Sequence, residues 1–271
     1  MLECQAIILS DSSSKRTFAL TITYDGTRYA GWQNQLNAIS IQQRIEEAVF
    51  KAFGFRLAVI ASGRTDSGVH ALGQVARLTL PKWNHDPQKI IPAINRRLPL
   101  DIAVRQVREV RTDFDPIRNA IAKRYRYSLR VAACPDPMQG PFHWYYPRPL
   151  DVAAMQTAAK CLTGCHDFVA FQTLGSPRKT TVRTIRNISV EMQNAMEGYD
   201  LLIEIEADGF LYNMVRNIVG SLVEIGIGRF GPRWMEDTLV SKDRSRAGQT
   251  APPQGLCLMR VDYPSACFLE T

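Results

Sequence analysis

The sequence predicts an α+β fold made of two related halves. Segments that alternate apolar and polar residues are typical of strands, and between them lie longer segments whose apolar residues recur every three to four positions, as in amphipathic helices. The 271 residues, of which 45% are hydrophobic, are enough for two domains with sizeable cores. No apolar run approaches the length of about 18 residues that a membrane span needs, so none is expected.

The first half of the sequence predicts the order strand, helix, strand, strand, helix, strand. These elements are expected at residues 17–24, 41–53, 57–60, 74–80, 86–97 and 101–110. Ser40 and Gln43 form a capping-box pattern at the start of the first helix, and Gly54 stands where it should end. Asp86 followed by Pro87 marks the start of the second helix. This order is the split β-α-β arrangement of ferredoxin-like folds, whose antiparallel sheet carries its helices on one face.

The second half predicts a similar series of elements. Strands are expected at residues 122–132, 180–192, 199–208 and 256–263, and helices at residues 151–164, 210–225 and 234–242. A proline-rich loop is expected at residues 134–149 and a polar loop at residues 243–254. No clear sequence repeat relates the halves, so duplication is inferred from element order alone. The predicted domains are an N-terminal extension, an N-terminal α+β lobe and a C-terminal α+β lobe, at residues 1–16, 17–114 and 115–271.

Basic residues outnumber acidic ones by 33 to 26, which gives a net charge of +7 and an isoelectric point near 9.2. The excess is concentrated in two segments: residues 105–130 hold eight Lys or Arg against three acids, and residues 172–189 hold four against none. Such clusters suit a phosphate backbone, because binding there is driven largely by counterion release. Charge alone leaves open a solvated basic surface that has no partner.

The six cysteines are scattered along a chain whose first residues lack the basic start and long apolar core of a secretion signal. Reduced thiols in a cytoplasmic protein are therefore expected. Cys161, Cys165 and His166 form a Cys-x3-Cys-His cluster that could suggest zinc. A structural zinc site normally has four ligands and no fourth is evident, so we expect no metal.

A polar loop separates the two strands expected at residues 57–60 and 74–80. Residues 63–70 read Gly-Arg-Thr-Asp-Ser-Gly-Val-His. One interpretation is a plain hairpin loop in which Asp66 satisfies nearby backbone amides. The other is a functional loop, because chemistry often sits on loops that a rigid scaffold positions. Trp32 raises a similar choice between stacking on a base and plugging the core.

Residues 63–71 resemble the catalytic-aspartate motif of the tRNA pseudouridine synthase A family. Four further stretches resemble motifs of the same family, in its order and spacing: Tyr24-Asp25-Gly26, Gly31-Trp32-Gln33, Lys123-Arg124-Tyr125-Arg126-Tyr127 and Met214-Val215-Arg216-Asn217-Ile218-Val219-Gly220. The resemblance covers residues 17–263. It implies two related ferredoxin-like, RRM-like lobes with antiparallel sheets and a basic active-site cleft between them.

The resemblance also implies an activity, the isomerisation of uridine to pseudouridine in the anticodon stem-loop of tRNA, at about positions 38, 39 and 40. That reaction needs no redox step, and no cofactor is expected. A carboxylate nucleophile suits such a stepwise exchange, and by resemblance Asp66 is that group, attacking either the sugar or the base. The family further implies a homodimer in which one tRNA contacts both subunits.

Arg216 and Tyr125 complete the catalytic set that the resemblance implies. Arg216 is expected to pair with Asp66 and keep it ionised, since a neighbouring cation favours the charged form. Tyr125 is expected to stack on the uracil and to take the C5 proton. Arg64 is expected to contact the RNA and help hold the target base out of its stack. The other expected substrate contacts are Thr65, His70, Arg124, Arg126 and Leu256, with Leu258 as an alternative to Leu256. His70 is expected to contact either the RNA or the backbone of its loop.

Two other functions remain open at this stage. A non-catalytic RNA-binding or RNA-folding protein could use the same scaffold, because a fold does not fix a function. The chain could also be a synthase that acts on another tRNA position or another RNA. The intact set of Asp66, Tyr125 and Arg216 argues against a pure binding protein.

Overall fold

The computed structural model describes residues 15–173, 175 and 180–269. Most of the predicted N-terminal extension, residues 1–14, therefore lies outside the described residues, as do Arg178 and Lys179 of the second basic segment. In the described part of the chain, no helix is both long and apolar enough to cross a membrane.

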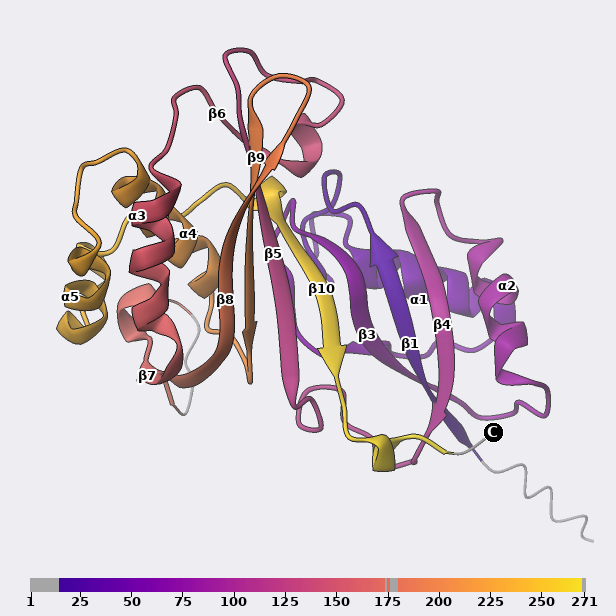
Figure 1. Ribbon diagram of the computed structural model, residues 1–271. Helices are drawn as coiled ribbons and strands as arrows, with labels where there is room; N and C mark the ends of the chain where they lie inside the picture. The colour runs from indigo at the N-terminus through magenta and orange to yellow at the C-terminus, as the bar shows by residue number, and fades with distance from the viewer. Residues whose placement is uncertain (1–14, 174, 176–179, 270–271) are drawn as a thin grey trace, which may run out of the picture.

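In the part of the chain that the structure describes, one mixed sheet of ten strands runs through both halves (Figure 1). Along the sheet the order is β4-β1-β3-β10-β5-β9-β8-β7, with β2 paired to β3 and β6 paired to β5. The strands are β1 (Arg16–Tyr24), β2 (Ile60–Ala61), β3 (His70–Leu80), β4 (Ile102–Val110), β5 (Ala122–Val131), β6 (Trp144–Tyr146), β7 (Gly164–Asp167), β8 (Val182–Asn194), β9 (Tyr199–Ala207) and β10 (Leu256–Asp262).

The two halves of the sheet meet where β10 pairs with β3. This pairing is parallel and short, with Cys257 and Leu258 opposite His70 and Ala71. On its other side β10 pairs antiparallel with β5. The edge of β3 is shared, because β2 occupies it further along, opposite Ala76 and Arg77.

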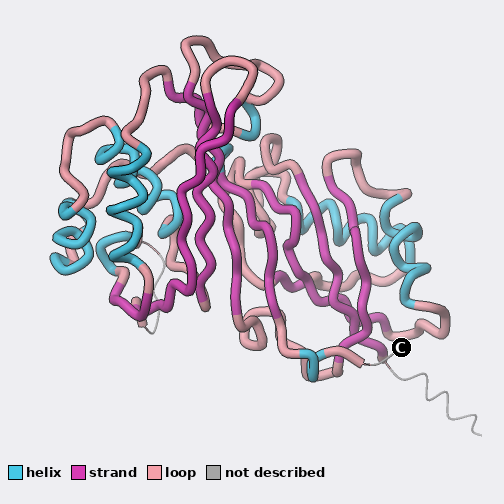
Figure 2. Tube along the Cα trace, viewed as in Figure 1, coloured by secondary structure: helices cyan, strands magenta, loops and turns pink. Residues whose placement is uncertain are grey.

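Among the described residues, five α-helices pack in two groups, which Figure 2 shows at opposite ends of the sheet. They are α1 (Ile41–Phe53), α2 (Ile90–Asn95), α3 (Val152–Ala159), α4 (Met214–Gly226) and α5 (Arg233–Ser241). The first two pack with β1, β3 and β4 into one hydrophobic core, and the other three pack with β5, β8 and β9 into a second. Tyr125 borders both cores, so it marks the boundary between the two halves.

The start and end of α1 follow the predicted capping, with one correction. The Ser40 hydroxyl accepts a hydrogen bond from the backbone of Gln43, and Gly54 ends the helix with a left-handed φ of 77°. The Gln43 side chain does not complete the capping box, because it donates to Glu47 instead. Trp32 is 2% exposed in the first core, which confirms the core interpretation over the base-stacking one.

Several other element boundaries differ from the predicted ones. The predicted extent of the strand at residues 57–60 is wrong, because the observed strand β2 holds only two residues. The short β2 leaves part of the β3 edge free to pair with β10. The second helix is shorter than predicted and opens with a 3-10 turn at Pro87–Lys89 before α2. The helix predicted at residues 210–225 begins only at Met214. The strands β6 and β7 were not predicted.

Candidate active site

Asp66 lies in the loop between β2 and β3. One edge of β3 is shared by two strands: residues 70–71 pair with β10, and residues 76–77 pair with β2. The first part of the loop is fixed by the buried amide of Gln74. Ser62 donates a hydrogen bond from its hydroxyl to Gln74 Oε1 at 2.8 Å. Gln74 Nε2 in turn donates to the carbonyl of Gly63 at 2.9 Å. These contacts hold the segment before Asp66 against β3.

Thr65 and Gly31 fix the loop against the first core. The hydroxyls of Thr65 and Tyr24 lie 2.8 Å apart, and the Thr65 carbonyl accepts a hydrogen bond from the backbone of Trp32 at 3.0 Å. A Cβ on Gly31 would lie 2.5 Å from that carbonyl, so only glycine fits there. The side chain of Thr65 is buried against Tyr24, which supports a role in positioning Asp66, and its expected substrate contact stays a prediction.

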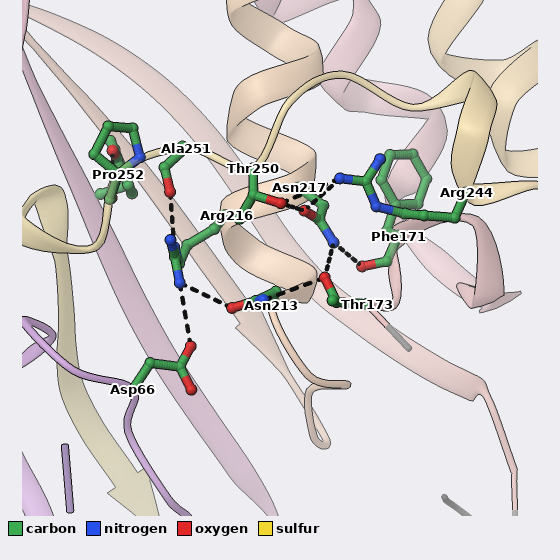
Figure 3. A network of polar contacts seen from close by, with 11 residues as sticks. Asp66, Phe171, Thr173, Asn213, Arg216, Asn217, Arg244, Thr250, Ala251 and Pro252 are labelled. Carbon is green, nitrogen blue, oxygen red and sulfur yellow. Dashed lines mark hydrogen bonds and ion pairs between the residues drawn. The ribbon is translucent and has the colours of Figure 1, made fainter. Parts of the chain in front are cut away.

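Asp66 and Arg216 come together from different halves of the chain (Figure 3). Arg216 lies in the first turn of α4, and its Nη1 is 3.4 Å from Asp66 Oδ2. The same Nη1 donates to Asn213 Oδ1 at 2.9 Å, while Nε donates to the carbonyl of Ala251 at 2.7 Å. The side chains of Arg216 and Asp66 are 15% and 30% exposed. The expected partner is therefore in place, and its guanidinium is held from three sides.

A buried network behind Arg216 fixes α4 to the loop that precedes β10 (Figure 3). The side chain of Asn217 donates to the carbonyl of Phe171 at 2.7 Å and accepts from Thr250 at 2.7 Å and Arg244 at 3.0 Å. The loop also crosses α4 closely, since a Cβ on Gly220 would lie 1.7 Å from a loop carbonyl. This crossing carries the Ala251 carbonyl to Arg216.

Burial governs the electrostatics of Asp66. It raises the pKa of the Asp66 carboxyl, and the charge and hydrogen bond of Arg216 oppose that rise without cancelling it. The expectation that Arg216 favours the ionised form is right in direction. The net pKa nevertheless stays above the ordinary value, because burial outweighs the effect of Arg216. Carboxylates in such environments are frequent at functional sites.

Tyr125 faces the same side of the sheet as the two helix groups. Its ring packs edge-on against Phe210, with centroids 5.1 Å apart and planes at 87°. Burial raises the pKa of its phenol, and the neighbouring Tyr24 and Asp66 add to the effect. Tyr125 therefore carries its proton at neutral pH and lies within electrostatic reach of Asp66.

The two candidate leucines lie in β10 beside β5. Leu258 is the cross-strand partner of Tyr125, and Leu256 is the partner of Tyr127. Both leucines are buried on the face that Tyr125 shares. Of the two, Leu258 is the one placed directly beside Tyr125.

His70 is buried and bound by the protein itself. Its Nδ1 accepts a hydrogen bond from the backbone of Gly26 at 3.1 Å, and its Nε2 lies 2.9 Å and 3.1 Å from the carbonyls of Pro141 and Gln254. Burial lowers the pKa of His70, which favours the neutral ring with its proton on Nε2. The carboxylate of Asp25, 3.2 Å from Nδ1, opposes this effect without overcoming it. These contacts support a structural role for His70, and its expected RNA contact stays a prediction.

Arg124 and Arg126 lie on the opposite face of the sheet from Tyr125, as their alternation predicted. Arg124 pairs with Glu206 at 2.7 Å and Arg126 pairs with Glu204 at 2.6 Å. Both arginines therefore lie on the face away from Tyr125, and their expected contact with the substrate stays a prediction. Unlike these two arginines, Arg64 has an exposed side chain that forms no hydrogen bond or ion pair with a described residue.

No group of three or more metal-binding side chains occurs within the described residues. In the suspected Cys-x3-Cys-His cluster, Cys161 Sγ donates to the carbonyl of Ala158 and His166 Nε2 lies 3.0 Å from the carbonyl of Thr163. These side chains make local contacts with the backbone rather than converging on a common point.

Sequence reasoning missed the residues that hold Arg216 in place. Asn213 lies next to the family-like motif, and its left-handed φ of 60° could not be read from its identity. Arg244 and Thr250 fall in a segment that predicted only a polar loop. Their roles depend on the approach of that loop to α4, for which Gly220 and Gly248 were the only sequence signals.

Comparison with known proteins places the chain among enzymes that act on tRNA. A family model described as tRNA pseudouridine synthase matches residues 20–117 and 158–264. Three curated proteins named tRNA pseudouridine synthase A are similar over nearly the whole chain. The protein of Pelobacter propionicus is 44% identical over 248 residues, which are 92% of this chain and 100% of that protein.

The other two relatives are from Chlamydia trachomatis serovar L2b and Myxococcus xanthus. The Chlamydia protein is 42% identical and covers 92% of both chains. The Myxococcus protein is 44% identical and covers 90% of this chain and 91% of its own.

Proposed function

This chain belongs to the tRNA pseudouridine synthase family, and we propose that it isomerises uridines in the anticodon stem-loop of tRNA, at about positions 38, 39 and 40. The observation that carries the proposal is the pair of Asp66 and Arg216, 3.4 Å apart, on the two motifs that resemble those of the family. A carboxylate held beside a guanidinium at a partly buried site is a suitable nucleophile for base exchange.

The reaction breaks the bond between the sugar C1′ and N1 of the base and forms a bond between C1′ and C5. The C5 carbon loses a proton and N1 gains one, so the product is an isomer of the substrate. We assign to the ionised Asp66 the role of covalent nucleophile, whether toward the sugar or toward the base. Arg216 would stabilise the carboxylate before attack and as it leaves, because its Nε and Nη1 are already oriented by the protein.

Tyr125 and Arg64 would act on the target base. Tyr125 would stack on the uracil, with Leu258 as its apolar neighbour and Leu256 one step further along β10. Because its pKa is raised, the phenol of Tyr125 is protonated. It could accept the C5 proton only if it released its own proton at the same time. Arg64 has no protein partner among the described residues and would contact the RNA where the base leaves its stack.

The family also supports a wider organisation for the protein. We propose two ferredoxin-like, RRM-like lobes, residues 17–114 and 115–271, with a basic cleft between them. The strand orders β4-β1-β3-β2 and β10-β5-β9-β8 support this division, because each follows the ferredoxin-like pattern 4-1-3-2. A homodimer in the cytoplasm with tRNA as its partner completes the proposal, and sedimentation would contradict the dimer by giving only a species of 30.5 kDa.

The test maps pseudouridine in unmodified tRNA transcripts for the wild type and Asp66→Asn. We expect product in the anticodon arm from the wild type and none from the variant, with tRNA binding retained by both. Product at another position would keep the reaction and replace the substrate site. Binding without product in either protein would favour the alternative of a non-catalytic RNA-binding or RNA-folding protein.

A further inference from the structure

A recess lies beside the C-terminal half of α4, away from Asp66. It is a cavity of about 300 Å³ whose lining includes Phe230, Trp234, Ser245, Arg246 and Gln249. We refer to it as the aromatic pocket. It lies between the start of α5 and the loop that leads to β10, and none of the roles assigned above uses it.

An aromatic pair forms one side of this pocket. The rings of Phe230 and Trp234 stack face to face, with centroids 4.0 Å apart and planes only 11° from parallel. Phe230 remains 37% exposed, and Trp234 is half-buried against the second core. A rigid, partly exposed pair of this kind offers a flat surface on which a base can stack.

Polar side chains without protein partners complete the pocket. The side chains of Arg246 and Gln249 form no hydrogen bond or ion pair with any residue that the structure describes, whereas the side chain of Ser245 hydrogen-bonds to the carboxylate of Asp243. The pKa of Asp243 is lowered by hydrogen bonds from the backbone and side chain of Ser245 and, to a smaller extent, by the charge of Arg246. A second arginine at the rim, Arg229, is neutralised by Glu224 at 2.9 Å. One available guanidinium beside an aromatic surface suits a nucleotide, with its phosphate and its base.

The pocket is connected to the active site through α4 and the loop before β10. Gly248 and Gln249 pack against Gly220 on the helix, and two residues later Ala251 accepts the hydrogen bond from Arg216. Glu224 at the pocket is eight residues beyond Arg216, or about 12 Å along the helix axis. At a rise of about 3.4 Å per nucleotide, this separation corresponds to about three or four nucleotides of stacked strand.

We propose that the aromatic pocket binds one unpaired nucleotide of the RNA substrate, about three or four nucleotides from the target uridine. The base would stack on Phe230 and Trp234, and Arg246 would contact its phosphate. The proposal rests on the tRNA substrate proposed above and adds a second contact by which the loop is recognised. The pocket would thereby help to set the distance between the target uridine and an unpaired base.

The test scans tRNA transcripts in which one loop nucleotide at a time is abasic and measures their affinity for the full-length protein. In the wild type we expect one position to weaken binding by about 5- to 150-fold, the range for one base stacked on an aromatic ring. In Trp234→Ala this position should become no more sensitive than its neighbours. Equal sensitivity profiles in the two proteins would overturn the proposal.

A second pair of variants covers the case in which Trp234→Ala disturbs α5. Arg246→Gln changes an exposed side chain in the pocket, and Arg233→Gln changes an exposed side chain of α5 outside its lining. We expect weaker tRNA binding and a smaller salt dependence in Arg246→Gln than in Arg233→Gln, and equal behaviour would overturn the proposal. Pseudouridine is measured in the same samples. Its absence with an intact binding profile would refute the reaction and leave the pocket assignment standing.

Discussion

Replacing Arg216 by Met tests the electrostatic pairing at the centre of the site. At 3.4 Å, two unit charges interact by roughly 5 kcal/mol at an effective dielectric constant of about 20. Measured contributions of charged hydrogen bonds are smaller, about 1.5–3 kcal/mol, because solvent competes. Asp66 keeps 30% of its side chain exposed, so the lower end applies. We therefore expect a coupling free energy of about 1.5 kcal/mol between the two side chains.

A double-mutant cycle in urea unfolding measures this coupling. It compares the wild type, Arg216→Met, Asp66→Asn and the double variant at neutral pH, and repeats the comparison in acid. Because the folded-state pKa of Asp66 is raised, its stabilising contribution is fully present below its unfolded pKa and is lost as the pH rises through its folded pKa. Arg216→Met should enlarge this loss, whereas Asp66→Asn should remove it.

Activity gives an independent measure of the same pairing. The acid limb of the kcat/KM profile reports the ionisation of the free enzyme. It should lie at higher pH in Arg216→Met, because the cation that opposes protonation is gone. Acid limbs that coincide, together with a coupling free energy below about 0.5 kcal/mol at neutral pH, would refute the electrostatic role of Arg216.

Three other variants probe the residues around this pair. Tyr125→Phe keeps the ring and removes the hydroxyl, so we expect tRNA binding to persist and single-turnover product formation to fall; an unchanged rate would limit Tyr125 to stacking. Gly220→Ala places a methyl group 1.7 Å from a loop carbonyl and should destabilise the fold by about 1–3 kcal/mol in urea unfolding, whereas Gly140→Ala, with open space around it, should not. Asn213→Asp supplies a second carboxylate for the same guanidinium nitrogen. The second carboxylate should therefore weaken the stabilisation of ionised Asp66 by Arg216 and move the acid limb of the pH profile to higher pH. Asn213→Ala introduces no competing charge and serves as the control.

The sequence predicted the order of the main elements because their signals are local. Ser40 and Asp151 accept hydrogen bonds from the first turns of their helices, as their positions suggested. Alternation along β5 correctly separated Tyr125 from Arg124 and Arg126. Such patterns depend on residues a few positions apart, which is why they survive in the folded chain.

The features that were not predicted depend on contacts between distant segments. The length of β2 is limited because β10 takes part of the β3 edge, and no local pattern encodes that competition. His70 looked accessible in a polar loop, but carbonyls from Pro141 and Gln254 enclose it. Likewise the size of the pKa shift of Asp66 depends on how deeply two halves of the chain bury one carboxyl group.

The position of β10 has a consequence for the order in which the protein matures. This strand, formed by residues 256–262, is inserted between β3 and β5, so it joins the first and second halves in the sheet. During synthesis the N-terminal half precedes β10, which supplies Leu258 and Val261 to the first core and pairs with His70 and Ala71 of β3. Asp66 and Arg216 are then brought to their final separation only when β10, which follows the other described strands in the chain, pairs with both β3 and β5. A nascent chain would therefore be folded in part, but chemically silent.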